Sequence, residues 1–211
     1  MPLFYQQNID DSTQLALWKI EEPESFFLER VTPQREVSHP YKRLQHLAGR
    51  YLLTILAEDF PLASITINQS RKPYLEGHPY YFSISHCGNY AAAIVSTSRS
   101  VGIDIEYKTP RLYNIMPKFL NDYEQDFLKE WEDLTAMHLQ MITLLWSAKE
   151  AIYKWYGEGG VDFKSDMLLS GPMVIRADEE VQMPFLFTKK TPPSHLTIEA
   201  RIFDGLVMAW T

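Results

Sequence analysis

Two stretches of the 211-residue sequence show the same order of elements, a helix-like segment followed by two strand-like runs. In the first, residues 41–60 have apolar side chains at helical spacing, and apolar, β-rich runs follow at 80–85 and 90–96. In the second, residues 141–157 show the helical spacing, and the later runs 195–203 and 206–211 flank an Asp-Gly pair that strongly favours a hairpin turn. We therefore expect helix and hairpin to recur.

This recurrence predicts an α+β fold made of two similar α/β halves, each with a helix packed on a small, mostly antiparallel sheet. We expect the first half to cover residues 1–100 and the second to cover residues 101–211, related by a pseudo-twofold axis with a cleft between them. Sequence identity between the halves is slight, so the repeat is inferred from the pattern of elements alone.

Composition restricts the class of protein. A single cysteine, Cys87, excludes an internal disulfide and is typical of a reducing compartment. The net charge of −7 argues against a general affinity for nucleic acid or anionic lipid, because both depend on clustered positive charge. The sequence begins without a secretory signal pattern, and its apolar runs are too short to cross a bilayer. We expect a cytoplasmic protein with no nucleic-acid or membrane partner, and the two-half construction favours a monomer.

The segment between the two helical stretches, residues 107–134, contains prolines that indicate a loop and then an acidic run typical of a capped surface helix. It is either an ordinary connection or a docking surface for an acidic helical partner. The second interpretation depends on apolar side chains placed beside basic ones, at Lys108, Arg111, Ile115, Met116, Lys118, Phe119 and Leu120.

Two acids lie in a short apolar strand-like segment, residues 101–107. Side chains alternate in a strand, so Asp104 and Glu106 share one face while the isoleucines between them point to the other. One interpretation is a half-exposed strand with a solvated face. The other is a pair of metal ligands, and the segment 146–154 bears on that choice.

In the second helical stretch, Trp146, Glu150 and Lys154 follow one another at intervals of four residues, on one side of the helix. As a surface pair, Glu150 and Lys154 would contribute only about 0.3–0.5 kcal/mol. If Glu150 instead meets Asp104 and Glu106, each pair of carboxylates repels by about 1–4 kcal/mol at 4 Å, depending on screening. Three such oxygen ligands, with no His or Cys, suit Mg²⁺ and a pyrophosphate substrate.

The residues "GIDIE" (102–106) followed by "WSAKEAIYK" (146–154) resemble the paired signature of the 4′-phosphopantetheinyl transferase superfamily. The length is similar to that of its larger, single-chain, pseudo-dimeric branch, typified by the surfactin-synthetase-activating enzyme. "RKPYL" (71–75) and "FSISHCG" (82–88) resemble the family's Lys-Pro and Ser-His segments in the same order. The resemblance covers roughly half of the chain.

The resemblance implies transfer of the phosphopantetheine arm of coenzyme A to a serine of an acyl or peptidyl carrier protein, with release of adenosine 3′,5′-bisphosphate. It implies Mg²⁺ held by Asp104, Glu106 and Glu150 against the pyrophosphate of the co-substrate. Glu150 would take the serine proton, directly or through water, and Lys154 would stabilise the leaving phosphate. Lys149 matches the same motif but points away from Glu150, so we expect it to contact another phosphate or the carrier.

For the nucleotide of coenzyme A, the resemblance places Lys72 and Pro73 by the adenine and Ser85 and His86 by the phosphates. On its own, His86 is typical of a structural turn residue. Some of the basic residues of the first helix would reach the 3′-phosphate, at positions Arg43, His46 and Arg50. The carrier would dock on the connecting segment, at Arg111, Met116, Phe119 and Leu120.

Two departures from the family pattern concern the nucleotide. Relatives are rich in basic residues ahead of the first helix, whereas here the segment of residues 20–40 has only Arg30 and Arg35. Arg71 stands where a glycine often precedes the Lys-Pro pair, and either adds a phosphate contact or changes a turn. "GEGG" (157–160) is interpreted as a helix terminator, not as a phosphate loop.

Two other functions stay open on this evidence. One is a non-catalytic module that binds a carrier without modifying it. The other is a different Mg²⁺-dependent phosphotransferase or nuclease, for which the net negative charge gives poor support.

Overall fold

The computed structural model describes residues 3–33 and 36–211, and the chain divides into two compact units. The first contains Met1–Ile105 and Lys154–Glu158, and the second contains Glu106–Tyr153 and Gly159–Thr211. The division thus falls a few residues after the boundary expected at 100/101. It also assigns the end of the second long helix to the first unit.

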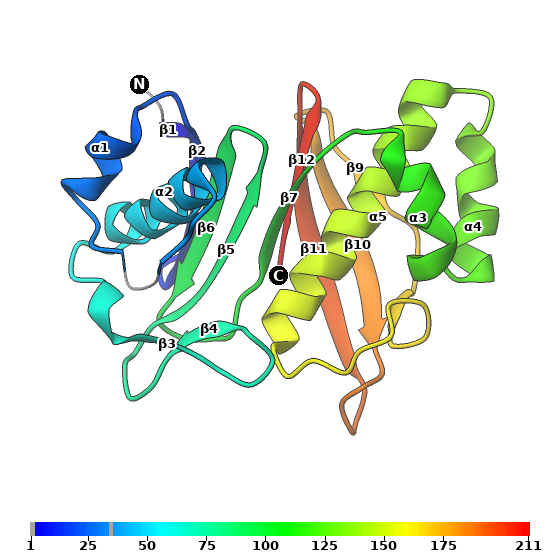
Figure 1. The fold of residues 1–211 in the computed structure, drawn as a ribbon. Coiled ribbons are helices and arrows are strands. Elements are labelled where there is room, and N and C mark those ends of the chain that lie inside the picture. The colour runs from blue at the N-terminus through cyan, green and yellow to red at the C-terminus, as the bar shows by residue number, and fades with distance from the viewer. Residues whose placement is uncertain (1–2, 34–35) are drawn as a thin grey trace. The chain divides into compact units, whose positions relative to one another are not determined.

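The first unit is built on a four-stranded antiparallel sheet with the strand order β1-β2-β6-β5 (Figure 1). The strands β3 and β4, which lie between α2 and β5 in the sequence, form a separate two-stranded sheet. The elements are β1 (Leu3–Asp10), β2 (Thr13–Lys19), α1 (Glu24–Leu28), α2 (Pro40–Leu56), the 3-10 turn η1 (Leu62–Ser64), β3 (Ile65–Ile67), β4 (Pro73–Leu75), β5 (Tyr81–Cys87) and β6 (Tyr90–Ser96).

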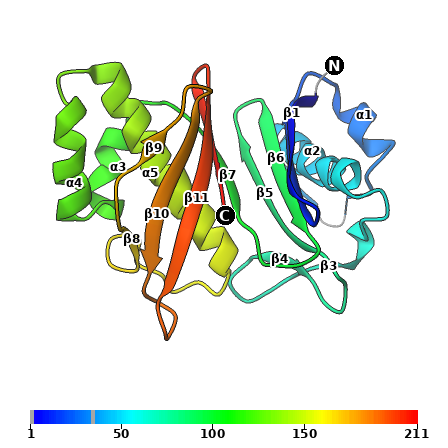
Figure 2. The same cartoon turned by 180° about the vertical axis from the view of Figure 1, so that it is seen from behind.

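The second unit contains a six-stranded sheet with the order β7-β12-β11-β10-β8, and β9 also pairs with β10 (Figure 2). The strand β7 (Ile103–Tyr107) crosses the division between the units. The other elements are α3 (Arg111–Phe119), α4 (Asp122–Leu128), η2 (Lys129–Trp131), α5 (Thr135–Tyr156), β8 (Met167–Leu169), β9 (Val174–Ile175), β10 (Glu180–Phe187), β11 (Ser194–Phe203) and β12 (Leu206–Trp210).

Helix α2 covers one face of the first sheet, which confirms the predicted helix and the hairpin that follows it (Figure 1). Its apolar side joins a buried core with Trp18, Phe27 and Phe82. Gly49 is where the helix comes closest to the sheet, because a Cβ there would lie 2.6 Å from Cγ2 of Ile84. Burial of this apolar surface, at about 25 cal/mol per Å², is what holds the helix on the sheet.

Helix α5 crosses the second sheet (Figures 1 and 2), and the predicted strands 195–203 and 206–211 are confirmed as β11 and β12. Its apolar residues, among them Leu145, Ala148 and Ile152, are fully buried. No helix in the described part of the chain, α5 included, combines the length and apolarity needed to cross a membrane.

The side of α5 that carries Lys149 is buried as well, where Phe119 of α3 and Glu124 of α4 contact this lysine. Lys149 is 0% exposed and donates from Nζ to Oε2 of Glu124 at 2.6 Å, to the Phe119 carbonyl at 2.8 Å and to the Phe163 carbonyl at 2.9 Å. Burial lowers the pKa of Lys149, and the Glu124 carboxylate opposes that shift. The three acceptors compensate an ammonium group that is removed from water.

Glu124 joins three elements at this point. It completes the capping box of α4, in which the Glu124 amide donates to Oδ1 of Asn121 and the Asn121 amide donates to Oε2 of Glu124. Its Oε1 accepts from the Leu169 amide of β8 at 3.0 Å. The predicted capped acidic helix is therefore confirmed, and its capping glutamate is also the counter-ion of Lys149.

Several parts of the sequence differ from expectation, among them β10, which the sequence pattern did not predict. The segment predicted as a loop is helical over α3, since Pro110 stands at the N-cap, where a proline costs no hydrogen bond of the helix, and Pro117 lies within the helix. The strands β1 and β2 were not predicted. Their burial patterns, alternating in β1 and nearly continuous in β2, show that one strand is an edge and the other is central.

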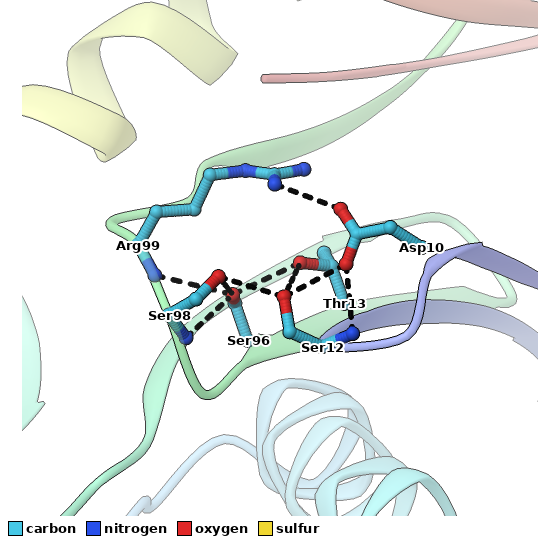
Figure 3. A network of polar contacts seen from close by, with 6 residues as sticks. All are labelled: Asp10, Ser12, Thr13, Ser96, Ser98 and Arg99. Atoms are coloured by element: carbon cyan, nitrogen blue, oxygen red, sulfur yellow. Dashed lines mark hydrogen bonds and ion pairs between the residues drawn. The ribbon is translucent and has the colours of Figure 1, made fainter.

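A polar network ties the β1–β2 turn to the segment that leads from β6 to β7 (Figure 3). Asp10 Oδ1 accepts from the amide and hydroxyl of Ser12, at 2.8 and 2.7 Å, and Asp10 Oδ2 accepts from Arg99 at 2.7 Å. The hydroxyls of Thr13 and Ser96 lie 2.9 Å apart. The hydrogen bonds from Ser12, together with Arg99, hold the pKa of Asp10 well below its usual value. The chain is thus fixed just ahead of β7.

The buried pair in the second unit predicts a large cost for removing one partner. We expect Glu124→Ala to lower the free energy of unfolding by about 3–5 kcal/mol, because Lys149 would be left buried without its counter-ion. Urea titration followed by tryptophan fluorescence measures this change.

Asp122→Ala is the matched control, since Asp122 is an exposed acid on the same helix, and we expect a change of about 0.5 kcal/mol or less. Equal losses at the two positions would show that the ion pair contributes nothing beyond general helix stability. Joint replacement of Glu124 by Leu and Lys149 by Met should recover part of the loss.

Candidate functional site

Lys154, Asp104 and Ser85 form a polar cluster within the first unit. Lys154 Nζ donates to Asp104 Oδ1 at 2.6 Å, to Ser85 Oγ at 2.9 Å and to the Ile103 carbonyl at 3.1 Å. The Ser85 hydroxyl in turn donates to Asp104 Oδ1 at 2.8 Å. The fold thus brings these three side chains into direct contact, although they lie within a span of 70 positions in the sequence.

The strand β7 is held against β5 by serine side chains. Ser83 and Ser85 share one face of β5, and their hydroxyls accept from the amides of Ile103 and Ile105 at 3.2 and 3.3 Å. Asp104 is 4% exposed as a result. The interpretation of this strand as having a solvated acidic face is therefore wrong for Asp104.

The other acid of β7 has a partner in the second unit. Glu106 is half-buried, and its Oε1 accepts from the indole Nε1 of Trp146 at 3.2 Å. The indole is held by Phe119 and Phe163, with ring centroids 4.9 and 5.7 Å away. Glu150 is half-buried on α5, one turn after Trp146 and one turn before Lys154.

The three acids suit magnesium by their chemistry, because Mg²⁺ prefers carboxylate oxygens. Asp104 belongs to the first unit, and Glu106 and Glu150 belong to the second. Within residues 3–33 and 36–211, no group of three or more His, Cys, Asp and Glu side chains is arranged as a metal site. Their joint role as metal ligands stays a prediction.

Lys149 has a structural position. All three donors of its ammonium group are used by the buried acceptors described above, and the side chain has no access to solvent. The expectation that it contacts a phosphate or the carrier is corrected accordingly. The sequence motif gave no sign of this, because the partner Glu124 lies 25 residues earlier.

Lys72 and Pro73 line a pocket of about 310 Å³ that lies entirely within the first unit. Its other walls include Tyr74, Phe82 and Tyr156. Lys72 Nζ donates to the Trp155 carbonyl at 3.3 Å, and burial lowers the pKa of its ammonium group. A pocket with aromatic walls and one cation at its edge can take a flat, anion-bearing ligand.

His86 follows Ser85 on β5 and is exposed. Crowding of its ring by protein atoms lowers its pKa below 6.5, and the nearby positive charge of Lys154 acts in the same direction. A bound anion would act in the opposite direction and raise the pKa of the imidazole.

Three basic residues of α2 already have contacts within the protein. Arg43 pairs with Glu24 through two hydrogen bonds of 2.7 and 3.0 Å. His46 and Arg50 are buried, with Nδ1 and Nη1 3.1 Å apart. The role of these three residues toward the 3′-phosphate stays a prediction.

Of the two basic residues ahead of α2, Arg30 stacks on the ring of Phe26, with its guanidinium carbon 3.9 Å from the centroid. Arg35 lies outside the described residues. Arg71 has φ of +65°, in the left-handed region where a glycine is favoured. Arg71 thus takes a backbone conformation that a glycine would adopt more readily.

The four residues expected to dock the carrier have different positions. Arg111 is exposed and Met116 is half-buried. Phe119 and Leu120 are 1% and 0% exposed, and the Phe119 ring packs against Trp146 of α5. For these two, the docking expectation is corrected, and they are core residues.

Sequence reasoning missed the loop of residues 68–72, which contacts the end of α5. Asn68 Nδ2 donates to the Gly157 carbonyl at 2.9 Å, across 89 positions of sequence. The local signal was present, since an asparagine followed two residues later by serine favours a side-chain-stabilised turn. The long-range contact had no sequence signal.

Comparisons with known proteins agree with the motif analysis. The family model described as 4′-phosphopantetheinyl transferase superfamily matches residues 100–209. The chain is 34% identical over 101 residues to the 4′-phosphopantetheinyl transferase of Bacillus subtilis, covering 46% of this chain and 42% of that protein. It is 32% identical over 126 residues to the 4′-phosphopantetheinyl transferase AcpT of Escherichia coli K12, covering 55% and 59%.

A third relative is the enterobactin synthase component D of Salmonella typhimurium, 28% identical over 119 residues, with 56% of this chain and 49% of that protein covered. The chain thus spans about half the length of these curated relatives. The match over residues 100–209 includes both acids of β7 and the whole of α5.

The cluster around Ser85 predicts a measurable loss of stability. Ser85→Ala removes a hydroxyl that accepts from Lys154 and from a backbone amide and donates to Asp104, so we expect the free energy of unfolding to fall by about 1–3 kcal/mol. The exposed Ser100→Ala, in the same unit, is the matched control and should change stability by about 0.5 kcal/mol or less. Equal urea midpoints for the two variants would contradict a buried, fully used hydroxyl at position 85.

Proposed function

Because the chain belongs to the 4′-phosphopantetheinyl transferase superfamily, we propose that it transfers 4′-phosphopantetheine from coenzyme A to a serine of an acyl or peptidyl carrier protein. The observation that carries this proposal is the contact of Lys154 with Asp104. It joins the two halves of the family signature, "GIDIE" and "WSAKEAIYK", by a direct ion pair.

Asp104, Glu106 and Glu150 would hold a magnesium ion. When bound, Mg²⁺ would neutralise oxygen charge on the pyrophosphate of coenzyme A. The contacts that support this assignment are those of the flanking side chains. Lys154 contacts Asp104, and Trp146 contacts Glu106. Glu150 lies on α5 between Trp146 and Lys154.

In the transfer step, the serine oxygen of the carrier attacks the phosphorus that bears the pantetheine arm. A new P–O bond forms, the bridging P–O bond of the pyrophosphate breaks, and adenosine 3′,5′-bisphosphate leaves with the electron pair. Glu150 takes the serine proton, directly or through water. Lys154 neutralises charge that develops on the leaving phosphate, which is the main requirement of phosphoryl transfer.

Lys154 is prepared for this role by its surroundings. Its side chain is 24% exposed, and its ammonium group contacts the Asp104 carboxylate and the Ser85 hydroxyl. It therefore keeps its position without a ligand, and a phosphate oxygen can reach its exposed side. A lysine that is already held in place loses little further freedom on binding.

For the nucleotide, we propose that the adenine enters the pocket beside Lys72 and Pro73, with His86 and Ser85 near the phosphates. His86 suits an anion because phosphate would favour its charged form. Arg43 would reach the 3′-phosphate only by exchanging its contact with Glu24. Arg111 and Met116 are proposed to contact the carrier.

The remaining parts of the proposal concern the whole molecule. They are a pseudo-twofold relation between the halves with the active site between them, a monomeric state and a cytoplasmic location. Each follows from the sequence pattern and the family resemblance.

The central test is a mass measurement. Purified protein with Mg²⁺ and coenzyme A should raise the mass of an apo carrier by one phosphopantetheine group. We expect Glu150→Gln to lower kcat by about 10²-fold or more while the circular dichroism spectrum stays unchanged, because the general base is lost.

Glu132→Gln, an exposed acid just ahead of the same helix, is the control and should keep full activity. Undiminished turnover by Glu150→Gln would remove Glu150 from the mechanism. Binding of the carrier without any mass gain would favour a non-catalytic module, and turnover of other diphosphates alone would favour a different phosphotransferase.

Metal dependence gives an independent test of the acids. Chelation with EDTA should abolish transfer, and added Mg²⁺ should restore it. Asp104→Asn should raise the Mg²⁺ concentration for half-maximal activity by about tenfold or more, because one anionic oxygen ligand is lost. An Mg²⁺ titration that is the same for Asp104→Asn and for the exposed Glu76→Gln would show that Asp104 is not a ligand.

A further inference from the structure

The turn between β3 and β4 is closed by the side chain of Asn68. Its Oδ1 accepts from the Lys72 amide at 2.8 Å and from the Ser70 hydroxyl at 2.7 Å. The backbone of the turn is paired as well, with the Asn68 amide donating to the Lys72 carbonyl and the Arg71 amide donating to the Asn68 carbonyl, each at 3.0 Å. The carboxamide therefore fixes the backbone that carries Lys72.

The same carboxamide reaches the end of α5. Its Nδ2 donates to the Gly157 carbonyl at 2.9 Å, and the Ser70 hydroxyl lies 2.5 Å from that carbonyl oxygen. Ser70 has one proton and so serves either Asn68 or Gly157 at a given moment. Nδ2 of Asn68 is then the constant donor to this carbonyl.

A second carbonyl at the helix end is bound by the same loop, since Lys72 Nζ donates to the Trp155 carbonyl. The last carbonyls of a helix have no partners within the helix, and a cation there interacts favourably with the helix dipole. The loop of residues 68–72 thus acts as a cap for α5.

The absence of a side chain at Gly157 leaves room for the side chain of Lys72. Its φ is +70°, and a Cβ built there would lie 2.3 Å from Cδ and 2.9 Å from Nζ of Lys72. Gly160 also has a positive φ, +63°, but a Cβ there would meet nothing within 4 Å. A side chain at Gly160 would therefore add backbone strain alone, whereas one at Gly157 would add the same strain and a clash with Lys72.

The capped turn is the one that carries Lys154. Lys154 precedes Gly157 by three residues and holds Asp104 and Ser85. We propose that Asn68 is a positioning residue, which ties the turn of Lys72 to the last turn of α5 and so sets the separation of Lys72 from Lys154. This inference rests on the proposed function, in which Lys72 and Lys154 serve opposite ends of the coenzyme A nucleotide.

A positioning role predicts a particular pattern of kinetic change. Without the link, Lys154 loses alignment with the leaving phosphate, so kcat falls, and Lys72 shifts at the adenine pocket, so KM for coenzyme A rises. KM for the carrier should stay the same, because neither lysine is assigned to the carrier. Misplacement of a catalytic group by a fraction of an ångström supports an effect of roughly tenfold on kcat.

The main experiment compares three variants of the full chain in the mass assay. Asn68→Ala removes every bond of the carboxamide. Asn68→Asp keeps the acceptor for Lys72 and Ser70 but replaces the donor to Gly157 by an oxygen. Gln69→Ala is the control, since Gln69 is an exposed residue of the same loop.

We expect both Asn68 variants to lose roughly tenfold in kcat and to raise KM for coenzyme A, with Gln69→Ala unchanged. Full activity of Asn68→Asp would overturn the proposal, because it would show that the turn alone matters. A rise in KM for the carrier that matches the rise for coenzyme A would also overturn it, since it would indicate a general loss of structure.

The glycine pair and hydrogen exchange supply readouts that do not depend on the loop variants. Gly157→Ala should reduce kcat further than Gly160→Ala, and equal effects would contradict contact with Lys72. Amide exchange over residues 153–158 should be about fivefold faster in Asn68→Ala than in Gln69→Ala. If the wild-type chain transfers nothing, the proposed function fails, and this exchange comparison alone decides whether Asn68 holds the helix end.

Discussion

The buried contact of Lys149 with Glu124 is the constraint on which the orientation of α5 depends. An ammonium group without access to solvent is tolerated only where its acceptors lie, so the helix cannot turn about its axis without a large cost. At about 100° per residue, Glu150 then points about 100° and Lys154 about 140° away from Lys149. The structural lysine therefore determines which direction the two proposed catalytic side chains face.

Two lysines five residues apart on one helix have opposite roles for this reason. Lys149 is compensated by a carboxylate and two carbonyls and has no further capacity to bind. Lys154 has a similar set of partners but remains partly exposed, so a ligand can approach it. Side-chain chemistry is the same in both, and access to solvent makes the difference.

In the first unit, contacts between distant segments stabilise the short elements around Lys154. The strand β7 is held to β5 by serine hydroxyls, the approach to β7 is fixed by Asp10 and Arg99, and the end of α5 is capped by Asn68. Each is a side-chain to backbone or ion-pair contact between segments distant in sequence. Together they restrain the few residues that surround Lys154, which is what phosphoryl transfer requires of a site.

The sequence predicted the two long helices, the hairpins β5–β6 and β11–β12, the capped helix α4, the acids of β7 and the family, because periodicity, capping residues and a spaced motif are local signals. It did not show that Lys149, Phe119 and Leu120 are interior residues, that prolines accompany a helix in α3, or that Asn68 meets Gly157. These features become visible in the folded chain, since burial and pairing depend on segments that are 25 to 89 positions apart. A motif fixes the type of side chain, whereas packing decides what that side chain touches.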